Sequence, residues 1–226
     1  MIRFECDYSE GAHEKIMQRL METNYEQTVG YSEDPYCASA REKIKIACDC
    51  PEAAVHFLVG GTQANATVIS SILRPHQGVL CADTGHINVH ETGAIEHSGH
   101  KVLALKHTNG LLAAETIHEA MEEHLAEDGP EHTVQPGMVY ISFSSEVGTV
   151  YSLQQLKEIA EVCHKYGTLL LVDNAHGAYL KFLSESRHPI DFGADIVLDS
   201  AHKTLPVLTG GAYLHLHKSL GKEFLG

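Results

Sequence analysis

Basic residues are scarce in this sequence. Its 226 residues contain 16 Lys and Arg against 30 Asp and Glu, which gives a formal net charge of −14 at pH 7. The basic residues also form no run at any point of the chain. A protein with this charge balance repels phosphate groups, so nucleic acids and anionic membrane surfaces are excluded as favoured partners.

Long apolar stretches are lacking as well. No window reaches the roughly 18 apolar residues of a membrane-spanning helix, and the beginning of the chain, MIRFECDYSEGAHEK, lacks the apolar core of a signal peptide. Apolar residues still make up 43% of the chain and charged residues 20%, which is typical of a folded globular protein. We therefore expect a soluble, cytoplasmic protein.

The spacing of cysteine and histidine gives little sign of a metal site. Cys48 and Cys50, the only close cysteine pair, are one residue too near for the C-x-x-C spacing of redox or zinc sites. Reduced thiols are the simpler interpretation. His86 and His90 have the spacing of a zinc pair on one helix face, but no third ligand is evident close to them. The sequence therefore predicts no metal site.

Seven apolar runs of strand length alternate with helical patterns. Several runs are continuously apolar, as expected for strands buried on both faces of a mainly parallel sheet. The expected strands cover residues 55–58, 79–82, 101–105, 138–143, 168–173, 195–199 and 211–216. The expected helices cover residues 12–23, 62–74, 114–126 and 152–166. This order predicts an α/β fold: a mixed, mainly parallel seven-stranded sheet with helices on both faces.

The helix expected at 152–166 has the clearest boundaries. Ser152 and Gln155 have the spacing of a capping box, in which each side chain bonds the other residue's backbone N–H. Gly167 follows the last turn, where a left-handed residue commonly ends a helix.

A glycine turn follows the first expected strand. Gly60 and Gly61 let the backbone turn sharply, and the hydroxyl of Thr62 is placed to cap the next helix. The unpaired N–H groups and the dipole of such a helix end suit a phosphate. Taken alone, the motif fits an ordinary glycine turn better than a binding site, because short glycine motifs are common.

Two charged residues lie at or after the ends of other expected strands. Asp173 ends the most apolar run, TLLLVD, at a place where open α/β sheets bind ligands. A carboxylate there could equally cap the next segment. Lys203 follows a later strand within SAHKT. A lysine in a polar pocket can form a Schiff base, whereas most lysines simply lie on the surface.

Together, the three features point to one cofactor. Pyridoxal 5′-phosphate needs a helix N-terminus for its phosphate, a carboxylate that keeps its ring nitrogen protonated, and a lysine that holds it covalently. The glycine turn, Asp173 and Lys203 offer these groups in the required order. The sequence therefore predicts that the protein binds pyridoxal 5′-phosphate.

Longer motifs support this prediction. The first four are YSEDP (31–35), GGTQAN (60–65), GHINVHETGAIE (85–96) and EVGTVYSLQQLKEIAEVCHKYG (146–167). Over residues 1 to about 172, they resemble the threonine aldolase and β-eliminating lyase family of the aspartate-aminotransferase-like fold. The last three are VDNAHGAYL (172–180), GADIV (193–197) and SAHKTLPVLTGGA (200–212). They are similar to the lysine region of the bacterial ornithine/lysine/arginine decarboxylases.

The resemblance implies roles for residues near the phosphate. Gly61, Thr62 and Gln63 would bind the phosphate itself. Ser200 and His202 would lie close to it.

It also implies roles around the ring. His86 would stack on the pyridine ring and assist proton transfer, and Asp173 would pair with the ring nitrogen. His176 would lie beside the ring or the substrate, and Lys203 would carry the cofactor as a Schiff base. Two further positions match the substrate or subunit interface of the family, namely Ser9 and Tyr31.

The chain departs from the family in two respects. Threonine aldolases usually have an arginine for the substrate carboxylate shortly after the strand-end Asp, and His176 takes that place here. Relatives in both branches also carry a further C-terminal domain, whereas the 226-residue chain leaves 23 residues after Lys203. We therefore expect one large cofactor-binding domain over 1–226, with an N-terminal segment 1–30, a core 31–226 and no small C-terminal domain.

The resemblance implies a lyase that acts on a small amino acid. The expected reaction is cleavage of a β-hydroxy amino acid such as threonine to glycine and an aldehyde, with His86 as the base. Three alternatives stay open: decarboxylation of a basic amino acid, a cofactor-binding domain without activity, and a histidine-rich metal-binding protein. Family members build their active sites across a two-fold interface, so a homodimer or homotetramer is expected.

Overall fold

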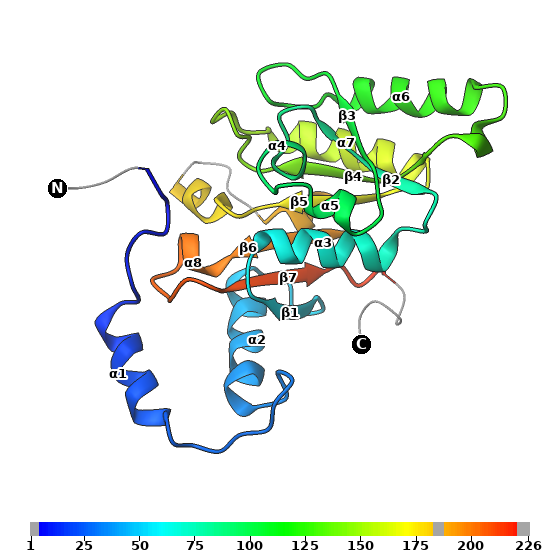
Figure 1. Ribbon diagram of the computed structural model, residues 1–226. Coiled ribbons are helices and arrows are strands. Elements are labelled where there is room, and N and C mark those ends of the chain that lie inside the picture. The colour runs from blue at the N-terminus through cyan, green and yellow to red at the C-terminus, as the bar shows by residue number, and fades with distance from the viewer. Residues whose placement is uncertain (1–4, 183–187, 221–226) are drawn as a thin grey trace.

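A seven-stranded sheet forms the centre of the protein (Figure 1). The structure is a computed structural model that describes residues 5–182 and 188–220. The strand order is β1-β7-β6-β5-β4-β2-β3. The strands are β1 (Ala54–Leu58), β2 (Gln77–Ala82), β3 (Val102–Leu105), β4 (Gln135–Ser142), β5 (Leu169–Asp173), β6 (Ile196–Ser200) and β7 (Ala212–Leu216). Strand β7 is antiparallel to its neighbours β1 and β6, and the other pairs are parallel, so the predicted mixed, mainly parallel sheet is confirmed.

Helices cover both faces of the sheet (Figure 1). The α-helices are α1 (Glu14–Thr23), α2 (Pro35–Ala47), α3 (Gly61–Ile72), α4 (His86–Val89), α5 (Ala94–His97), α6 (Ala114–Ala126), α7 (Leu153–Lys165) and α8 (Ala201–Thr204). Short 3-10 helices are η1 (Pro130–His132), η2 (Gly177–Phe182) and η3 (Pro189–Phe192). The four longest predicted helices are therefore confirmed. None of the described helices is long and apolar enough to cross a membrane.

Alternate residues of the central strands divide the core into two layers. On β4, Val139 and Ile141 pack with the buried side chains of α6 and α7. Met138 and Tyr140 point to the other face and pack with those of α3 and α5. This alternation follows from the pleat of a strand. It explains why the strands read as continuous apolar runs, since both of their faces are buried.

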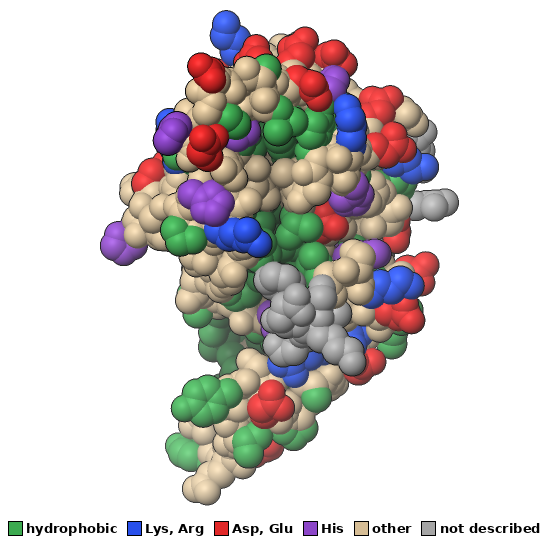
Figure 2. Space-filling view, turned by 90° about the vertical axis from the view of Figure 1, so that its right-hand side faces the viewer, with side chains coloured by type: hydrophobic (Ala, Val, Ile, Leu, Met, Phe, Trp, Pro, Cys, Tyr) green, Lys and Arg blue, Asp and Glu red, His purple; other side chains and the backbone are tan. Residues whose placement is uncertain are grey.

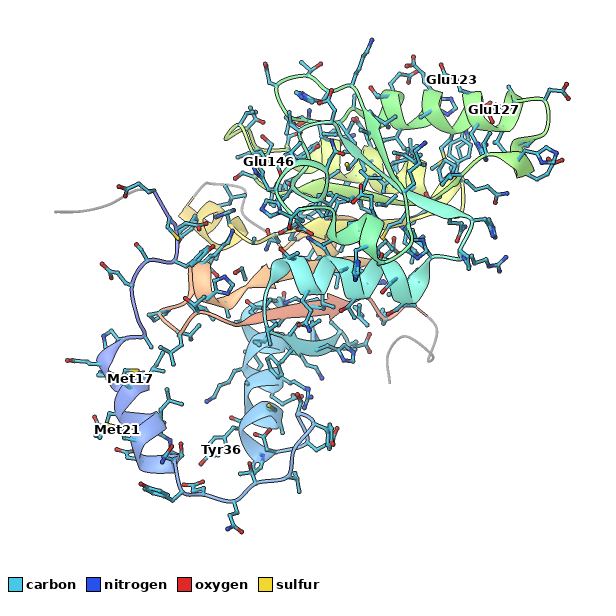
Figure 3. The ribbon with its side chains drawn as sticks, viewed as in Figure 1. Met17, Met21, Tyr36, Glu123, Glu127 and Glu146 are labelled. Atoms are coloured by element: carbon cyan, nitrogen blue, oxygen red, sulfur yellow. The ribbon has the colours of Figure 1, made fainter. Side chains whose placement is uncertain are left out.

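The N-terminal part lies away from the sheet. Figure 1 shows α1 at the lower end of the molecule, and no residue of α1 is buried. Its predicted apolar face exists, but Met17 and Met21, labelled in Figure 3, are exposed. Figure 2 shows apolar side chains on this lower end and acidic side chains gathered at the opposite end. Of the predicted domain 1–226, residues 1–4, 183–187 and 221–226 lie outside the described part.

The capping box of α7 generates a stability prediction. The Ser152 hydroxyl accepts a hydrogen bond from Gln155 N–H at 3.2 Å, and Gln155 Oε1 accepts one from Ser152 N–H at 2.8 Å. Ser152→Ala removes the first bond and should lower the free energy of unfolding by about 1 kcal/mol in urea denaturation. Ser70→Ala, on the exposed face of α3, is the control and should change it by less than about 0.5 kcal/mol. Equal effects of the two substitutions would contradict the capping role.

Candidate functional site

A polar cavity of about 510 Å³ lies where the carboxyl ends of β4, β5 and β6 meet the first turns of α3 and α4. Its wall contains eight of the eleven predicted site residues, which come from segments far apart in the sequence. They are Gly61, Thr62, His86, Asp173, His176, Ser200, His202 and Lys203. The structure therefore brings the glycine turn, the strand-end Asp and the Lys to one cavity. Their roles in binding stay predictions.

Asp173 is a buried carboxylate held by three donors. Its Oδ2 accepts hydrogen bonds from Tyr140 Oη at 2.8 Å and from Asn65 Nδ2 at 3.2 Å. Its Oδ1 accepts one from Ala175 N–H at 3.1 Å. Burial raises the pKa of Tyr140, so its phenol stays protonated and remains a donor. The buried carboxylate of Asp173 is therefore satisfied by protein donors, and the Ala175 bond shows that it also fixes the following turn. Its pairing with a cofactor ring nitrogen stays a prediction.

His86 is tied to the same network through Glu91. Its Nδ1 lies 2.9 Å from Glu91 Oε1, and Asn65 Nδ2 donates to that oxygen at 2.8 Å. The hydrogen bond to Glu91 raises the pKa of His86, and the charge of Asp173 adds to this, whereas burial and Lys203 act against it. Asn65 thus links the carboxylates of Glu91 and Asp173 through a single amide group.

Helix α3 begins at the wall of the cavity. Its N-cap residue is Gly60, which has no side chain to bond the first N–H groups. The prediction that Thr62 caps this helix is wrong, because Thr62 lies within the first turn rather than before it. Gln63 does not line the cavity, and its Oε1 accepts a hydrogen bond from Val59 N–H at 3.0 Å. The helix end therefore keeps backbone N–H groups that no side chain caps.

Ser200 and His202 complete this side of the cavity. Ser200 is buried, and its Oγ has no hydrogen-bond partner among the described residues. His202 Nδ1 lies 2.9 Å from the carbonyl oxygen of Gly211, and its ring meets that of Tyr8 edge-on at 5.2 Å. A buried hydroxyl without a partner is costly. A ligand with hydrogen-bonding oxygens would satisfy it.

Lys203 lines the cavity and lies beside Asp7, an acidic residue of the N-terminal segment. Its Nζ is 3.3 Å from Asp7 Oδ2, and His176 Nε2 is 2.6 Å from the same oxygen. Burial raises the pKa of Asp7, but the hydrogen bond to His176 and the charge of Lys203 outweigh it, so the pKa of Asp7 is lowered. The Tyr179 hydroxyl donates to the carbonyl oxygen of Lys203 at 2.6 Å and fixes the backbone there.

Besides Gln63, two further predicted residues do not line the cavity, namely Ser9 and Tyr31. Ser9 is exposed, and its hydroxyl donates to the carbonyl oxygen of Cys6 at 3.4 Å. Tyr31 is fully exposed and adopts a positive φ of 61°. Since neither side chain lines the cavity of this chain, their placement at a substrate or subunit interface stays a prediction.

Several residues of the site were not predicted. Asn65 and Glu91 belong to the quoted motifs GGTQAN and GHINVHETGAIE, so their polarity within a helix or turn was the available signal. Tyr140 lies in an apolar strand and gave no signal. Glu146, labelled in Figure 3, lines the cavity after β4 and accepts a hydrogen bond from the Ser142 hydroxyl.

The residues present fit pyridoxal 5′-phosphate. The first turn of α3 offers backbone N–H groups to a phosphate, and the unpartnered Ser200 hydroxyl lines the same cavity. Asp173 keeps lone pairs for a protonated ring nitrogen, since its known donors use only part of its capacity. Lys203 supplies the amine. Each group that the cofactor requires is thus present.

The pairing of His86 with Glu91 generates a pH prediction. In the chain without cofactor, NMR titration should give His86 a pKa above the ordinary histidine value. Glu91→Gln removes the carboxylate that accepts the hydrogen bond of His86 and should lower the pKa of His86. An unchanged pKa of His86 in Glu91→Gln would contradict the assignment of Glu91 as its partner.

Comparisons with known proteins agree with this geometry. The chain is 29% identical over 177 residues to a low specificity L-threonine aldolase of Pseudomonas sp. (strain NCIMB 10558), which covers 76% of this chain and 49% of that protein. It is 26% identical over 229 residues to a low specificity L-threonine aldolase of Pseudomonas aeruginosa, with coverages of 98% and 64%. A solved threonine aldolase of Leishmania major matches with a TM-score of 0.85 and 36% identity, over 94% of this chain and 61% of that one.

The chain therefore spans between about half and two thirds of the length of these relatives. Residues 5–215 match the beta-eliminating lyase family, which is nearly the whole described chain. The chain belongs to the beta-eliminating lyase family.

Proposed function

We propose that the cavity binds pyridoxal 5′-phosphate and that the chain is the cofactor-binding part of a lyase that cleaves β-hydroxy amino acids. The observation that carries the proposal is the meeting of Asp173, Lys203 and the first turn of α3 at one cavity. The threonine aldolases among its relatives support the reaction. When bound, this cofactor supplies an electron sink for cleavage of a bond at the substrate α-carbon.

Asp173 would hold the proton on the ring nitrogen. Tyr140 and Asn65 both donate to its Oδ2, which fixes the plane of the carboxylate. Together with the bond from Ala175 N–H, these bonds hold both carboxylate oxygens in place for an ion pair with a protonated nitrogen. Asp173 would therefore keep the ring in its electron-accepting form.

The opposite end of the cavity would hold the phosphate. Backbone N–H groups of Gly61 and Thr62 carry the positive end of the α3 dipole. The Ser200 hydroxyl would donate a further hydrogen bond to a phosphate oxygen. The backbone N–H groups and the Ser200 hydroxyl would lose little conformational entropy on binding a phosphate, because α3 and β6 already hold them in place.

His86 would stack on the ring and move a proton. Its Nδ1 faces Glu91, which leaves Nε2 for exchange with a substrate hydroxyl. The hydrogen bond to Glu91 raises the pKa of His86, which strengthens the ring as a proton acceptor. Glu91 is the positioning residue that fixes the ring and its tautomer.

Lys203 would hold the cofactor and release it to the amine of the substrate. In this structure Asp7 Oδ2 is its charged partner at 3.3 Å. Asp7 also contacts His176, the residue at the position where threonine aldolases usually have an arginine. A substrate carboxylate could take the place of Asp7 beside Lys203 and His176, which would position the α-carbon near Lys203.

Decarboxylation of a basic amino acid is the second candidate function. It rests on the similarity of SAHKTLPVLTGGA to the decarboxylase lysine region and on the acidic lining of the cavity. Glu91 and Glu146 both line it, and either carboxylate suits a cationic side chain. The two reactions share the residues described above and differ in which bond at the α-carbon is held perpendicular to the ring.

We also propose that the chain assembles into a homodimer or homotetramer. The apolar side chains that α1 leaves exposed support this, since a large exposed apolar patch marks an interface. Light scattering of the purified chain would measure the assembly, and a monomer at all concentrations would contradict it.

An absorbance spectrum tests the binding proposal. Addition of pyridoxal 5′-phosphate to the purified chain should give the visible band of a lysine Schiff base, and borohydride should fix the label on Lys203. Lys203→Ala should abolish the band because the amine is lost, whereas Lys157→Ala, a lysine outside the cavity lining, should keep it. A band that survives in Lys203→Ala would overturn the assignment.

Product analysis tests the reaction. With threonine we expect glycine and acetaldehyde, at a rate reduced about 100-fold or more by His86→Asn, because the proton-transfer group is lost. Release of carbon dioxide from lysine, ornithine or arginine would favour the second candidate. A chain that binds the cofactor but converts none of these amino acids would be a binding domain without activity.

A further inference from the structure

We propose a structural zinc site formed by Cys48, His188 and His215. One donor atom of each side chain lies within 4.8 Å of the donor atoms of the other two. The three residues come from the end of α2, from the residue before η3 and from β7, so only the fold brings them together. None of them lines the cavity described above, and the proposal does not depend on the proposed function.

The spacing of the donors suits a tetrahedral ion. The distance from Cys48 Sγ to His215 Nε2 is 3.9 Å. With Zn–S bonds of about 2.3 Å and Zn–N bonds of about 2.0 Å, donors of a tetrahedral site lie about 3.5 Å apart. The other two pairs of donor atoms lie within 4.8 Å, so the three donors would draw closer together when they bind the ion.

Asp199 provides the next oxygen. Its Oδ2 is 3.1 Å from His215 Nε2 and 3.3 Å from His188 Nε2, and its side chain is 9% exposed. Its other oxygen accepts a hydrogen bond from Asn174 Nδ2 at 2.6 Å, which fixes the carboxylate. Because this oxygen lies beside the Nε2 atoms of both histidines, Asp199 is placed to complete the coordination of the ion as its fourth ligand.

Cys50 holds the other side of His215. Its Sγ lies 3.5 Å from His215 Nδ1, so each ring nitrogen of this histidine has a neighbour of its own. His215 is fully buried and Cys50 nearly so. A ligating histidine whose second nitrogen is held keeps a fixed ring orientation. Cys50 is therefore a positioning residue. Cys48 alone of this C-x-C pair would bind the ion, so the pair does not need the longer C-x-x-C spacing.

The donor types select the metal. A thiolate with two imidazoles suits zinc, whereas magnesium and calcium prefer oxygen ligands. His215 is fully buried and Cys48 and His188 are half-buried, which suits a structural rather than a catalytic ion. A bound ion would join the end of α2 to β7 and to the segment before η3, and would so strengthen the antiparallel edge of the sheet.

Metal content and competition with a chromophoric chelator test the proposal. The cofactor-loaded chain should bind one Zn²⁺, and Co²⁺ in its place should give a thiolate charge-transfer band. Cys48→Ser and His188→Asn should each weaken zinc binding by more than about 10-fold, and Asp199→Asn by about 10- to 100-fold. The charge-transfer band should vanish in Cys48→Ser alone, which separates a lost ligand from a general loss of structure.

Three variants outside the proposed zinc site serve as controls. Cys37→Ser, on the same helix, and His132→Asn, on the surface, should leave zinc affinity unchanged. His86→Asn removes a donor of the cavity group His86, Glu91 and Asp173 and should also leave it unchanged. Zinc binding that survives in Cys48→Ser, or that is lost in His86→Asn, would overturn the proposal. So would a Cys48–Cys50 disulfide in the purified protein that binds no zinc.

Discussion

The buried carboxylate of Asp173 is the constraint on which the site depends. A charge at this depth is stable only when donors surround it, and the donors come from two other elements, Tyr140 on β4 and Asn65 on α3. Asn65 in turn holds Glu91, which holds His86. One polar chain therefore fixes a helix and two strand ends relative to one another. Loss of any member would remove a hydrogen bond from another buried polar group.

Sheet topology places Lys203 beside this network. Strands β5 and β6 are parallel neighbours, and Asp173 is in register with Leu198. Both strands therefore end at the same edge of the sheet, where Ser200, the last residue of β6, and Lys203, in the short helix α8 that follows, line the cavity. The antiparallel strand β7 then returns beside β6 and supplies His215 to the cluster with Cys48 and His188. The cavity thus lies at the ends of β5 and β6, and the cluster of Cys48, His188 and His215 lies against β7.

Local patterns were sufficient to predict the seven strands and four of the helices, whereas helix α2 and the long-range contacts were not predicted. The apolar runs placed all seven strands, because buried parallel strands are apolar on both faces. Ser152 and Gln155 marked the start of α7, since a capping box acts within four residues. Thr62 failed as a cap because the helix starts one residue earlier than expected. Contacts such as Tyr140 with Asp173 depend on strand register, which no local pattern states.

In the proposed site, Asp173 and Lys203 bind the same cofactor molecule at two of its groups, the ring nitrogen and the aldehyde carbon. A crystal structure of the chain grown with pyridoxal 5′-phosphate tests it most directly. We expect continuous density from Lys203 Nζ to the cofactor, with the ring nitrogen about 2.8 Å from an oxygen of Asp173. Density on another lysine, or a ring nitrogen turned away from Asp173, would contradict the claim.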